Sequence, residues 1–236
     1  MKIGLSVTVH DSELNPTGYS DLKLALDSFK DFCLSDKYIV VVDNQSENVD
    51  VAPVKMASEY IIVTNQKAGG GLTGAWNRGV AKCVENGCDV IINSNEDVLF
   101  NKSLNDFTDL IYNFDDKVNG LFGPITNIGG TSTYHQQRPV ATVTKNLIET
   151  TNQLSSHGGQ GYALNGFFTG FSKEFYDKFN VDGNLFSTKE KDFWGGQEVE
   201  LFERCTPQGM RSFIAECCYV QHKKNKAWLR RRNDSK

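Results

Sequence analysis

Short apolar runs alternate with stretches of helical periodicity along the first hundred residues. The apolar runs are rich in β-branched side chains and short enough to be buried strands, and they span residues 3–9, 38–42, 61–63 and 90–92. Between them, apolar residues recur three and four positions apart from Leu22 to Cys33 and from Leu72 to Cys83, as on one face of a helix. This β-α-β-β-α-β order predicts an α/β domain with a mostly parallel central sheet flanked by helices.

The pattern is less regular beyond the first hundred residues. Helical spacing recurs over residues 104–114, and residues 121–127 and 212–220 are predicted as strands, the first of them leaving the core. Residues 128–160 are polar and lack periodicity, and a stretch of this length is usually functional or mobile. No linker or repeat divides the sequence, so we expect residues 1–236 to form a single domain.

Polar side chains follow several of the predicted strands, at the end where each strand stops. They are His10, Asp11, Asp43, Asn65, Asn95, Glu96, Asp97 and His222. The carboxyl ends of parallel strands are neighbours in space, and open α/β sheets bind their ligands at that edge. We therefore expect a site there, with Asp97 and either Asn95 or Glu96 facing a divalent metal ion. The alternative is a polar turn, because Asn and Ser are also frequent turn residues.

A glycine run precedes the second predicted helix. Gly69, Gly70 and Gly71 would let a phosphate group approach backbone N–H groups at the helix start. The run fits neither the Walker pattern nor a G-x-G-x-x-G turn directly after a first strand, which disfavours an ATPase and a dinucleotide enzyme. A flexible loop is the alternative interpretation.

Two further side chains are candidates for chemistry. His222 is a possible metal ligand, since imidazole suits Mn, Fe and Zn, but a histidine beside two lysines is more often a solvated surface residue. Glu198 would serve as a general base if it is partly buried. Its alternative role is structural, because an acidic side chain at a helix start is stabilised by the helix dipole.

Composition narrows the classes of partner. The net charge of −4 over 236 residues argues against a general nucleic-acid binder. Six cysteines without a CxxC pair argue against structural zinc and for a reduced, cytoplasmic protein. Residues 1–9 are predicted as a strand rather than a signal peptide, and no apolar run is long enough for a membrane span. The seven basic residues from Lys223 onward form a solvated end, or else close over a diphosphate or touch a membrane surface peripherally.

Several segments together resemble nucleotide-sugar glycosyltransferases of the GT-A fold, especially those of family 2. The resemblance runs from Ile3 to about His222. Its segments are Val40-Val-Val-Asp43-Asn44-Gln-Ser46, the run from Asn65 and Gly69 to Ala75-Trp-Asn77-Arg-Gly79, Asn95-Glu96-Asp97, Gly123-Pro124-Ile-Thr-Asn127 and Trp194-Gly195-Gly196-Gln197-Glu198-Val199-Glu200-Leu201, with His222 where many members place a third metal ligand.

The resemblance implies an inverting hexosyl- or deoxyhexosyltransferase that moves a sugar from a nucleotide diphosphate sugar to a hydroxyl of a glycan or glycoconjugate. It implies donor contacts from His10, Asp43, Asn65, Gly70, Gly71, Asn77, Asn95 and Glu96. It further implies Mn²⁺ or Mg²⁺ on Asp97 and His222, Glu198 as the general base, and acceptor contacts from Phe193, Trp194, Gly195 and Gly196. Residues 1–100 would then be the nucleotide-sugar-binding half, 101–222 the acceptor-binding and catalytic half, and 223–236 a basic tail.

Two positions depart from the family pattern. Asn95 replaces the first carboxylate of the Asp-x-Asp motif, and Gln197-Glu198 replaces a Glu-Asp pair. These replacements leave open a non-catalytic nucleotide-sugar or glycan-binding module. A sugar nucleotidyltransferase is the third alternative, and it is disfavoured because such enzymes carry a glycine-rich loop with Arg and Lys after the first strand, where this sequence has His10-Asp-Ser-Glu.

Overall fold

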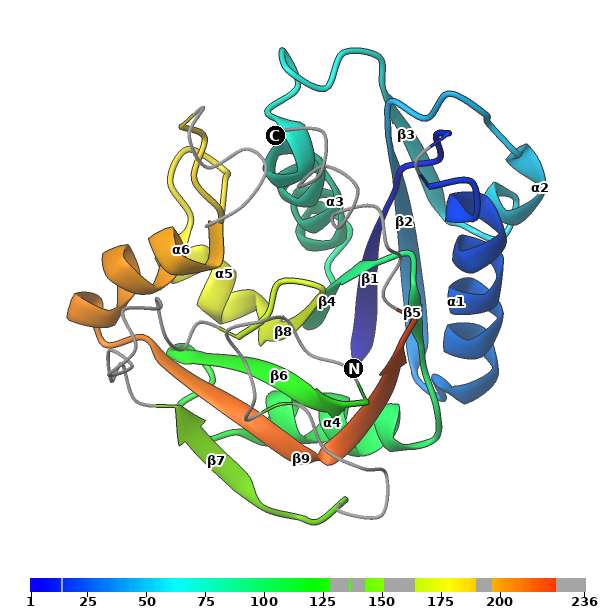
Figure 1. Cartoon of the computed structure of the whole chain (residues 1–236). Coiled ribbons are helices and arrows are strands. Elements are labelled where there is room, and N and C mark those ends of the chain that lie inside the picture. The colour runs from blue at the N-terminus through cyan, green and yellow to red at the C-terminus, as the bar shows by residue number, and fades with distance from the viewer. Residues whose placement is uncertain (14, 128–135, 137–142, 151–163, 190–196, 224–236) are drawn as a thin grey trace, which may run out of the picture.

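The computed structural model describes residues 1–13, 15–127, 136, 143–150, 164–189 and 197–223. Within these residues, nine strands form one mixed sheet with helices on both faces (Figure 1). The elements in chain order are β1 (Lys2–Val9), α1 (Gly18–Phe32), β2 (Asp36–Asn44), α2 (Val51–Val54), β3 (Glu59–Val63), α3 (Gly71–Glu85), β4 (Val90–Asn95), β5 (Val98–Leu99), α4 (Ser103–Asn113), β6 (Gly120–Thr126), β7 (Leu147–Thr150), β8 (Phe168–Ser172), α5 (Lys173–Phe179), α6 (Gln197–Cys205), the 3-10 turn η3 (Thr206–Gln208) and β9 (Arg211–His222).

The first half of the chain has the predicted order of strands and helices. β1, β2, β3 and β4 pair in parallel, in the spatial order β3-β2-β1-β4, and α1 and α3 provide the two long connections. The one-turn helix α2 is an addition that hydrophobic periodicity could not predict, because a single turn contains too few residues to show a period.

The second half of the sheet is mixed rather than mostly parallel. β8 lies between β4 and β6 and is antiparallel to both, and β5 and β7 run antiparallel to β9. Among the described strands of this half, only β6 and β9 pair in parallel. The apolar content of β6 and β8 agrees with their burial. The direction of a strand depends on how its connection turns back, which its own residues do not encode.

β6 does not leave the core as predicted. All seven of its residues are buried, and the strand lies between β8 and β9. Pro124 stands in the middle of this strand, where it cannot donate a ladder hydrogen bond. The register between β6 and β9 shifts immediately after Pro124, so the sheet accommodates the proline at an irregularity.

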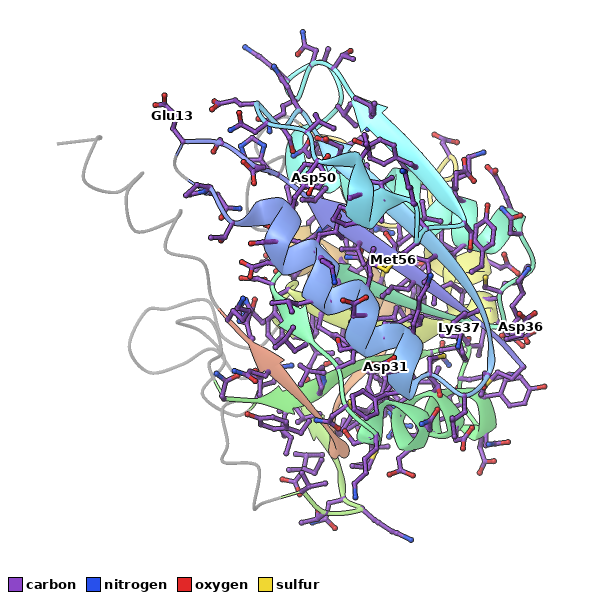
Figure 2. The ribbon with its side chains drawn as sticks, turned by 90° about the vertical axis from the view of Figure 1, so that its right-hand side faces the viewer. Glu13, Asp31, Asp36, Lys37, Asp50 and Met56 are labelled. Atoms are coloured by element: carbon purple, nitrogen blue, oxygen red, sulfur yellow. The ribbon has the colours of Figure 1, made fainter. Side chains whose placement is uncertain are left out.

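Each face of the sheet has its own apolar core. One face packs against α1, α2 and α4, and the other against α3, α5 and α6. Figure 2 looks onto the first face, with α1 in front of the strands and Met56, which packs against the same core, labelled beside it. Along β1, Ile3, Leu5, Val7 and Val9 face α1, whereas Gly79 of α3 lies over Ser6 on the opposite face. Across the described residues, none of the helices has both the length and the apolar character that crossing a bilayer requires.

Candidate functional site

Strand register brings several of the predicted polar strand ends together. Val9 lies opposite Asp43 in the β1–β2 pair, and Thr8 lies opposite Asn95 in the β1–β4 pair. His10 follows β1 directly. The carboxyl ends of β1, β2 and β4 therefore form one polar edge, as the parallel pairing of these strands predicts.

Asp97 and His222 face each other at this edge. The short pairing of β5 with β9 places Val98 opposite His222, and it brings Oδ2 of Asp97 to 3.4 Å from Nε2 of His222. Both side chains are buried, and the Lys223 backbone N–H donates to the carbonyl oxygen of Asp97 at 2.8 Å. The family resemblance assigned both residues to one metal ion, and the β5–β9 pairing is what puts their side chains in contact.

Neighbouring residues hold His222 in place. The Phe167 ring stacks on the imidazole with centroids 4.2 Å apart and planes 6° from parallel. Asn127 accepts a hydrogen bond from the His222 N–H at 2.8 Å and donates one to its carbonyl oxygen at 3.2 Å. Asn127 ends the Gly123-Pro124-Ile-Thr-Asn127 segment, so this segment positions a candidate metal ligand.

The Asp97–His222 pair fits a hard or borderline divalent cation. A carboxylate oxygen and an imidazole nitrogen are suitable ligands for Mn²⁺ or Mg²⁺ when a substrate supplies further oxygens. The side chains of the described ranges form no group of three or more His, Cys, Asp or Glu residues with the geometry of a metal site. A metal here would therefore depend on two protein ligands and on oxygens from its substrate.

The residues that precede Asp97 have different surroundings. Glu96 is half-buried and accepts a hydrogen bond from the Asn15 side chain at 3.0 Å. Burial, and then the charge of Asp97, raises the pKa of the Glu96 carboxyl well above its usual range. The backbone N–H of Asn95 donates to the Phe167 carbonyl oxygen at 2.9 Å, which attaches the end of β4 to the segment that carries the Phe167 ring.

Lys223 and Asp21 form an ion pair that sequence reasoning missed. The Lys223 ammonium group contacts a carboxylate oxygen of Asp21, a buried residue in the first turn of α1. Asp21 also accepts a hydrogen bond from the Thr17 hydroxyl at 2.9 Å. In sequence Asp21 is typical of a helix cap, so no local signal pointed to a partner about two hundred residues away.

Asp43 is fully buried at the end of β2. One of its carboxylate oxygens accepts hydrogen bonds from the Tyr19 and Tyr60 hydroxyls, and the other accepts one from the Ser46 N–H at 2.7 Å. Burial and the hydrogen bond to Asp43 raise the pKa of the Tyr19 hydroxyl. In this geometry Asp43 organises the loop after β2, and a direct contact with a nucleotide stays a prediction.

His10 lies beside the loop that follows β2. Its Nδ1 is 3.0 Å from the Asn44 carbonyl oxygen and 3.1 Å from the Gln66 side-chain amide. The Gln66 amide also donates to the Asn44 carbonyl oxygen, and its backbone N–H donates to the Gln45 side chain. Gln66 thereby connects the ends of β1, β2 and β3, a role that its position in a loop did not indicate.

The glycine run uses its own backbone donors locally. The N–H groups of Gly69 and Gly71 donate to the carbonyl oxygens of Asn65 and Gln66 at 2.8 and 2.7 Å, and that of Gly70 donates to Lys67 at 3.3 Å. Gly70 and Gly71 have φ of 84° and 61°, a backbone conformation that favours glycine. Asn65 is exposed, and its side chain accepts from the Ala68 N–H. A phosphate contact by this run stays a prediction, and it would have to compete with these bonds.

The helix that follows the glycines carries packing residues. Asn77 forms two hydrogen bonds with the Phe186 backbone, donating at 3.1 Å and accepting at 2.9 Å. A Cβ atom on Gly79 would lie 2.1 Å from the Ser6 hydroxyl, so α3 can approach β1 only with glycine at this position. These two residues of the resemblance therefore fix α3 on the sheet, and a donor contact by Asn77 stays a prediction.

Glu198 lies in the first turn of α6 and points toward the segment before β8. Its Oε1 accepts a hydrogen bond from the Gly166 N–H at 2.7 Å. Burial raises the pKa of the Glu198 carboxyl. Arg204 of the same helix donates to the backbone carbonyl oxygens of Phe179 and Leu185 at 2.8 and 2.7 Å, which anchors α6 to the core around α5.

Gly166 and Phe167 connect the two parts of the candidate site. Gly166 holds the Glu198 carboxylate, and the adjacent Phe167 stacks on His222. A candidate base and a candidate metal ligand are therefore anchored by consecutive residues. The predicted acceptor residues Phe193, Trp194, Gly195 and Gly196 lie outside the described residues, as does the basic tail beyond Lys223.

Solved structures with the same architecture have low sequence identity to this chain. GalNAc-T7 with UDP, GalNAc and Mn²⁺ superposes with a TM-score of 0.59 and 12% identity over 94% of this chain. TarS 1–349 of S. aureus superposes over 98% of this chain, with a TM-score of 0.63 and 14% identity for its UDP complex and 0.61 and 11% for TarS 1–349 alone. This chain covers 44% of the GalNAc-T7 chain and 63% of the TarS chain. These likenesses confirm the fold, a GT-A glycosyltransferase architecture.

Sequence comparison gives the family. No curated protein matches this sequence at a significant level. The sequence model of the family described as "Glycosyl transferase family 2" matches residues 15–179, which is more than half of the chain and includes β2, α3, β4 and the Asn95-Glu96-Asp97 segment. The chain therefore belongs to glycosyl transferase family 2.

Proposed function

We propose that this domain is an inverting glycosyltransferase that transfers a sugar from a nucleotide diphosphate sugar to a hydroxyl group of a glycan or glycoconjugate. One observation supports the proposal. The Gly166–Phe167 segment holds the Glu198 carboxylate by its backbone and the His222 imidazole by ring stacking, so consecutive residues anchor both Glu198 and the His222 that faces Asp97. Family membership and the UDP and Mn²⁺ present in the GalNAc-T7 structure agree with this chemistry.

Glu198 would act as the general base. Its carboxylate accepts the proton of the acceptor hydroxyl while the hydroxyl oxygen forms a bond to the anomeric carbon, and the bond from that carbon to the diphosphate oxygen breaks. Attack from the face opposite the leaving group inverts the anomeric centre. Burial raises the pKa of Glu198 and so brings it closer to the working pH, where a base is both ionised and basic enough to accept a proton.

Asp97 and His222 would hold the divalent metal. When bound, Mn²⁺ or Mg²⁺ would supply positive charge that stabilises the departing nucleoside diphosphate. The chain's own contribution is the orientation of the two ligands: Asn127 fixes the His222 backbone, Phe167 fixes its ring, and the Lys223 N–H fixes the Asp97 backbone. Fixed ligand orientation is what makes a site with few protein ligands effective.

The donor would lie across the carboxyl edge of β1, β2 and β4. Its nucleoside half would lie near His10, Asp43 and Asn65, its phosphates near Gly70 and Gly71, and its sugar near Asn95 and Glu96. We place the domain in the cytoplasm and assign residues 1–100 to donor binding and 101–222 to acceptor binding and catalysis. We further propose that residues 223–236 make peripheral contact with a membrane surface.

A non-catalytic nucleotide-sugar-binding module is the second candidate. The observation that favours it is the Asn95-Glu96-Asp97 sequence. An Asp-x-Asp motif has a carboxylate at its first and third positions, whereas this sequence has Asn95 at the first position and keeps only the third, Asp97. A binder would retain affinity for the donor without releasing nucleoside diphosphate.

A ligand panel followed by a turnover assay tests the proposal. The Tm of the protein is measured with UDP, GDP, dTDP and their sugars, with and without Mn²⁺, because a specific ligand raises Tm as its concentration increases. The donor that binds is then incubated with candidate acceptors, and free nucleoside diphosphate is measured. Asp97→Ala should abolish the metal-dependent rise in Tm, whereas Asp109→Ala, at an exposed position of α4, should leave it intact.

The possible outcomes separate the two candidates. A metal-dependent rise in Tm with release of nucleoside diphosphate supports the enzyme, and a rise without release supports the binding module. Absence of a Tm shift with every nucleotide would contradict both, and an unchanged transfer rate in Asp97→Ala and Glu198→Gln would show that the site assignment is wrong.

A further inference from the structure

The face of the sheet that α3 covers changes from apolar to polar toward the candidate site. Near the amino ends of β1 and β4, this face carries Ile91 of β4 and its partner Phe171 of the antiparallel β8. Toward the carboxyl ends of β1 and β4, it carries Ser6 and Thr8 of β1, Asn93 and Asn95 of β4, and Thr169 of β8. Alternate residues of a strand project to the same face of the sheet. Asn93 and Asn95 therefore share the face of Ile91, and Thr169 shares the face of Phe171. Ser6 lies under Gly79 of α3, so Ser6 and Thr8 are on this face as well.

These polar residues are contiguous across three strands. Register pairs Ser6 with Asn93 and Thr8 with Asn95, and it pairs Asn93 with Thr169 on the other side of β4. Directly paired residues project to the same side with their Cβ atoms about 4.5–5.5 Å apart. The Ser6 hydroxyl is 3.3 Å from the Asn93 side-chain oxygen, which agrees with this arrangement. They form a single patch, which we call the polar floor (Ser6, Thr8, Asn93, Asn95 and Thr169).

Among the described residues, four side-chain atoms of the polar floor have no hydrogen-bond partner. Thr8 Oγ1, Asn93 Nδ2, Asn95 Oδ1 and Thr169 Oγ1 are buried atoms without a hydrogen-bond partner in the described part of the protein. Thr8, Asn93 and Thr169 are at most 2% exposed. The indole Nε1 of Trp76, on the helix above, is in the same condition.

Leaving these polar groups without a hydrogen-bond partner would reduce the stability of the folded protein. A buried donor or acceptor without a partner costs more than an ordinary hydrogen bond contributes, and native proteins leave few such groups. Four of them in one patch would cost a large part of the net stability of a domain. Hydrogen-bonding molecules small enough to enter a nearly inaccessible layer would remove this cost.

We propose that the polar floor binds internal water molecules between β1, β4 and β8 on one side and α3 on the other. The ligand is water because Thr8, Asn93 and Thr169 are too buried to admit a sugar, and because donors and acceptors alternate across the patch as a bridging water requires. Asn93 offers an N–H donor, Asn95 offers a carbonyl acceptor, and the two threonine hydroxyls serve as either.

The bound water has a consequence for the site above it. Asn95 ends β4 two residues before Asp97, and Trp76 lies against Gly166, which holds Glu198. Water that connects Asn95 to the strands beside it fixes the end of β4, and therefore the approach to the metal-ligand pair. The layer is a structural feature of the folded chain, and it does not depend on transfer activity.

The sign of a stability change tests the proposal. Thr169→Val and Thr8→Val replace a hydroxyl by a methyl group of the same shape. If the hydroxyls are hydrated, both variants lose hydrogen bonds and their Tm should fall. If the layer is dry, each substitution removes an unpaired polar group and Tm should stay equal or rise, which would overturn the proposal.

A matched control sets the scale of this change. Thr108 of α4 is equally buried, and its hydroxyl donates to the Asn105 carbonyl oxygen at 3.1 Å. Thr108→Val therefore measures the loss of one known hydrogen bond, and the floor variants should lose a comparable amount of Tm.

A high-resolution crystal structure of the unmodified protein gives a second test that does not depend on whether the variants fold. Ordered water within hydrogen-bond distance of Thr8 Oγ1 and Thr169 Oγ1 would support the proposal, and a dry layer would refute it. Failure of every nucleotide to bind would count against the proposed function without affecting either measurement.

Discussion

Gly166 is the position where a minimal change should separate stability from catalysis. Its N–H donates to Oε1 of Glu198 at 2.7 Å, and it has no side chain between that carboxylate and the Trp76 ring. A Cβ atom on Gly166 would lie 2.2 Å from Oε1 of Glu198 and 2.4 Å from Cη2 of Trp76. Gly166→Ala therefore adds one methyl group at a point that the Glu198 and Trp76 side chains already approach closely.

The size of the effect follows from these distances. Cβ atoms ordinarily contact their neighbours at 3.4–4 Å, so the carboxylate or the indole must move by about 1 Å. Overpacking of this kind costs about 1–3 kcal/mol of unfolding free energy. A displacement of about 1 Å in a catalytic group costs about 100-fold in rate. We expect a protein that still folds, with kcat reduced about 100-fold if Glu198 is the base.

The assay compares Gly166→Ala with Gly170→Ala. A Cβ atom on Gly170 would lie 2.5 Å from Phe107 and 2.8 Å from Ile111, so this variant is overpacked to a similar degree on the face that α4 covers. Urea unfolding gives the free energies of both variants, and release of nucleoside diphosphate gives kcat. Both should lose similar stability, and Gly170→Ala should keep its kcat at temperatures where it is folded.

One outcome would refute the reasoning directly. If folded Gly166→Ala retains the wild-type kcat, the contact between Gly166 and Glu198 is not part of the catalytic geometry. If Gly170→Ala loses as much kcat as Gly166→Ala, general destabilisation explains the loss, and displacement of Glu198 is not its cause.

Three further predictions concern named contacts. Burial raises the pKa of Glu198 above its unfolded value of 4.5. The wild type should therefore lose stability relative to Glu198→Gln as pH rises through the folded pKa. A Tm difference between the two proteins that is equal at pH 4 and pH 8 would contradict this. Tyr60→Phe removes a hydrogen bond to the buried Asp43 carboxylate and should cost about 1 kcal/mol in urea unfolding; a cost near zero would show that Asp43 is satisfied without it. Asn127→Ala releases the His222 backbone and should weaken Mn²⁺ binding about 10–100-fold in calorimetric titration, whereas unchanged affinity would exclude a positioning role.

Much of the fold could be predicted from residue patterns. Apolar residues at alternate positions of β1 and the helical spacing from Leu22 to Phe29 predicted their elements because burial selects one face of a strand or helix. β8 was not predicted, because five buried residues that include a glycine and two phenylalanines match no single period.

The candidate site was predicted in part, and the part that was missed involves backbone groups. Asp97, His222 and Glu198 carry side-chain chemistry that is visible in sequence. Gly166 acts through its backbone N–H, and nothing in its local sequence indicates that it contacts Glu198. Asn127 belongs to a segment that resembles the family, but the sequence does not indicate that its side chain binds the His222 backbone.

The sequence by itself determined the parallel half of the sheet, the polar edge where its strands end and the family to which the chain belongs. These features depend on residues that are close in sequence, so local burial and chain connectivity encode them. Only the tertiary structure decided that Asp97 faces His222, that Asp43 is enclosed by two tyrosines and that Lys223 pairs with Asp21. Those contacts join strands and helices far apart in the chain, and their geometry arises only when β9 packs beside β5 and α1 packs on the sheet.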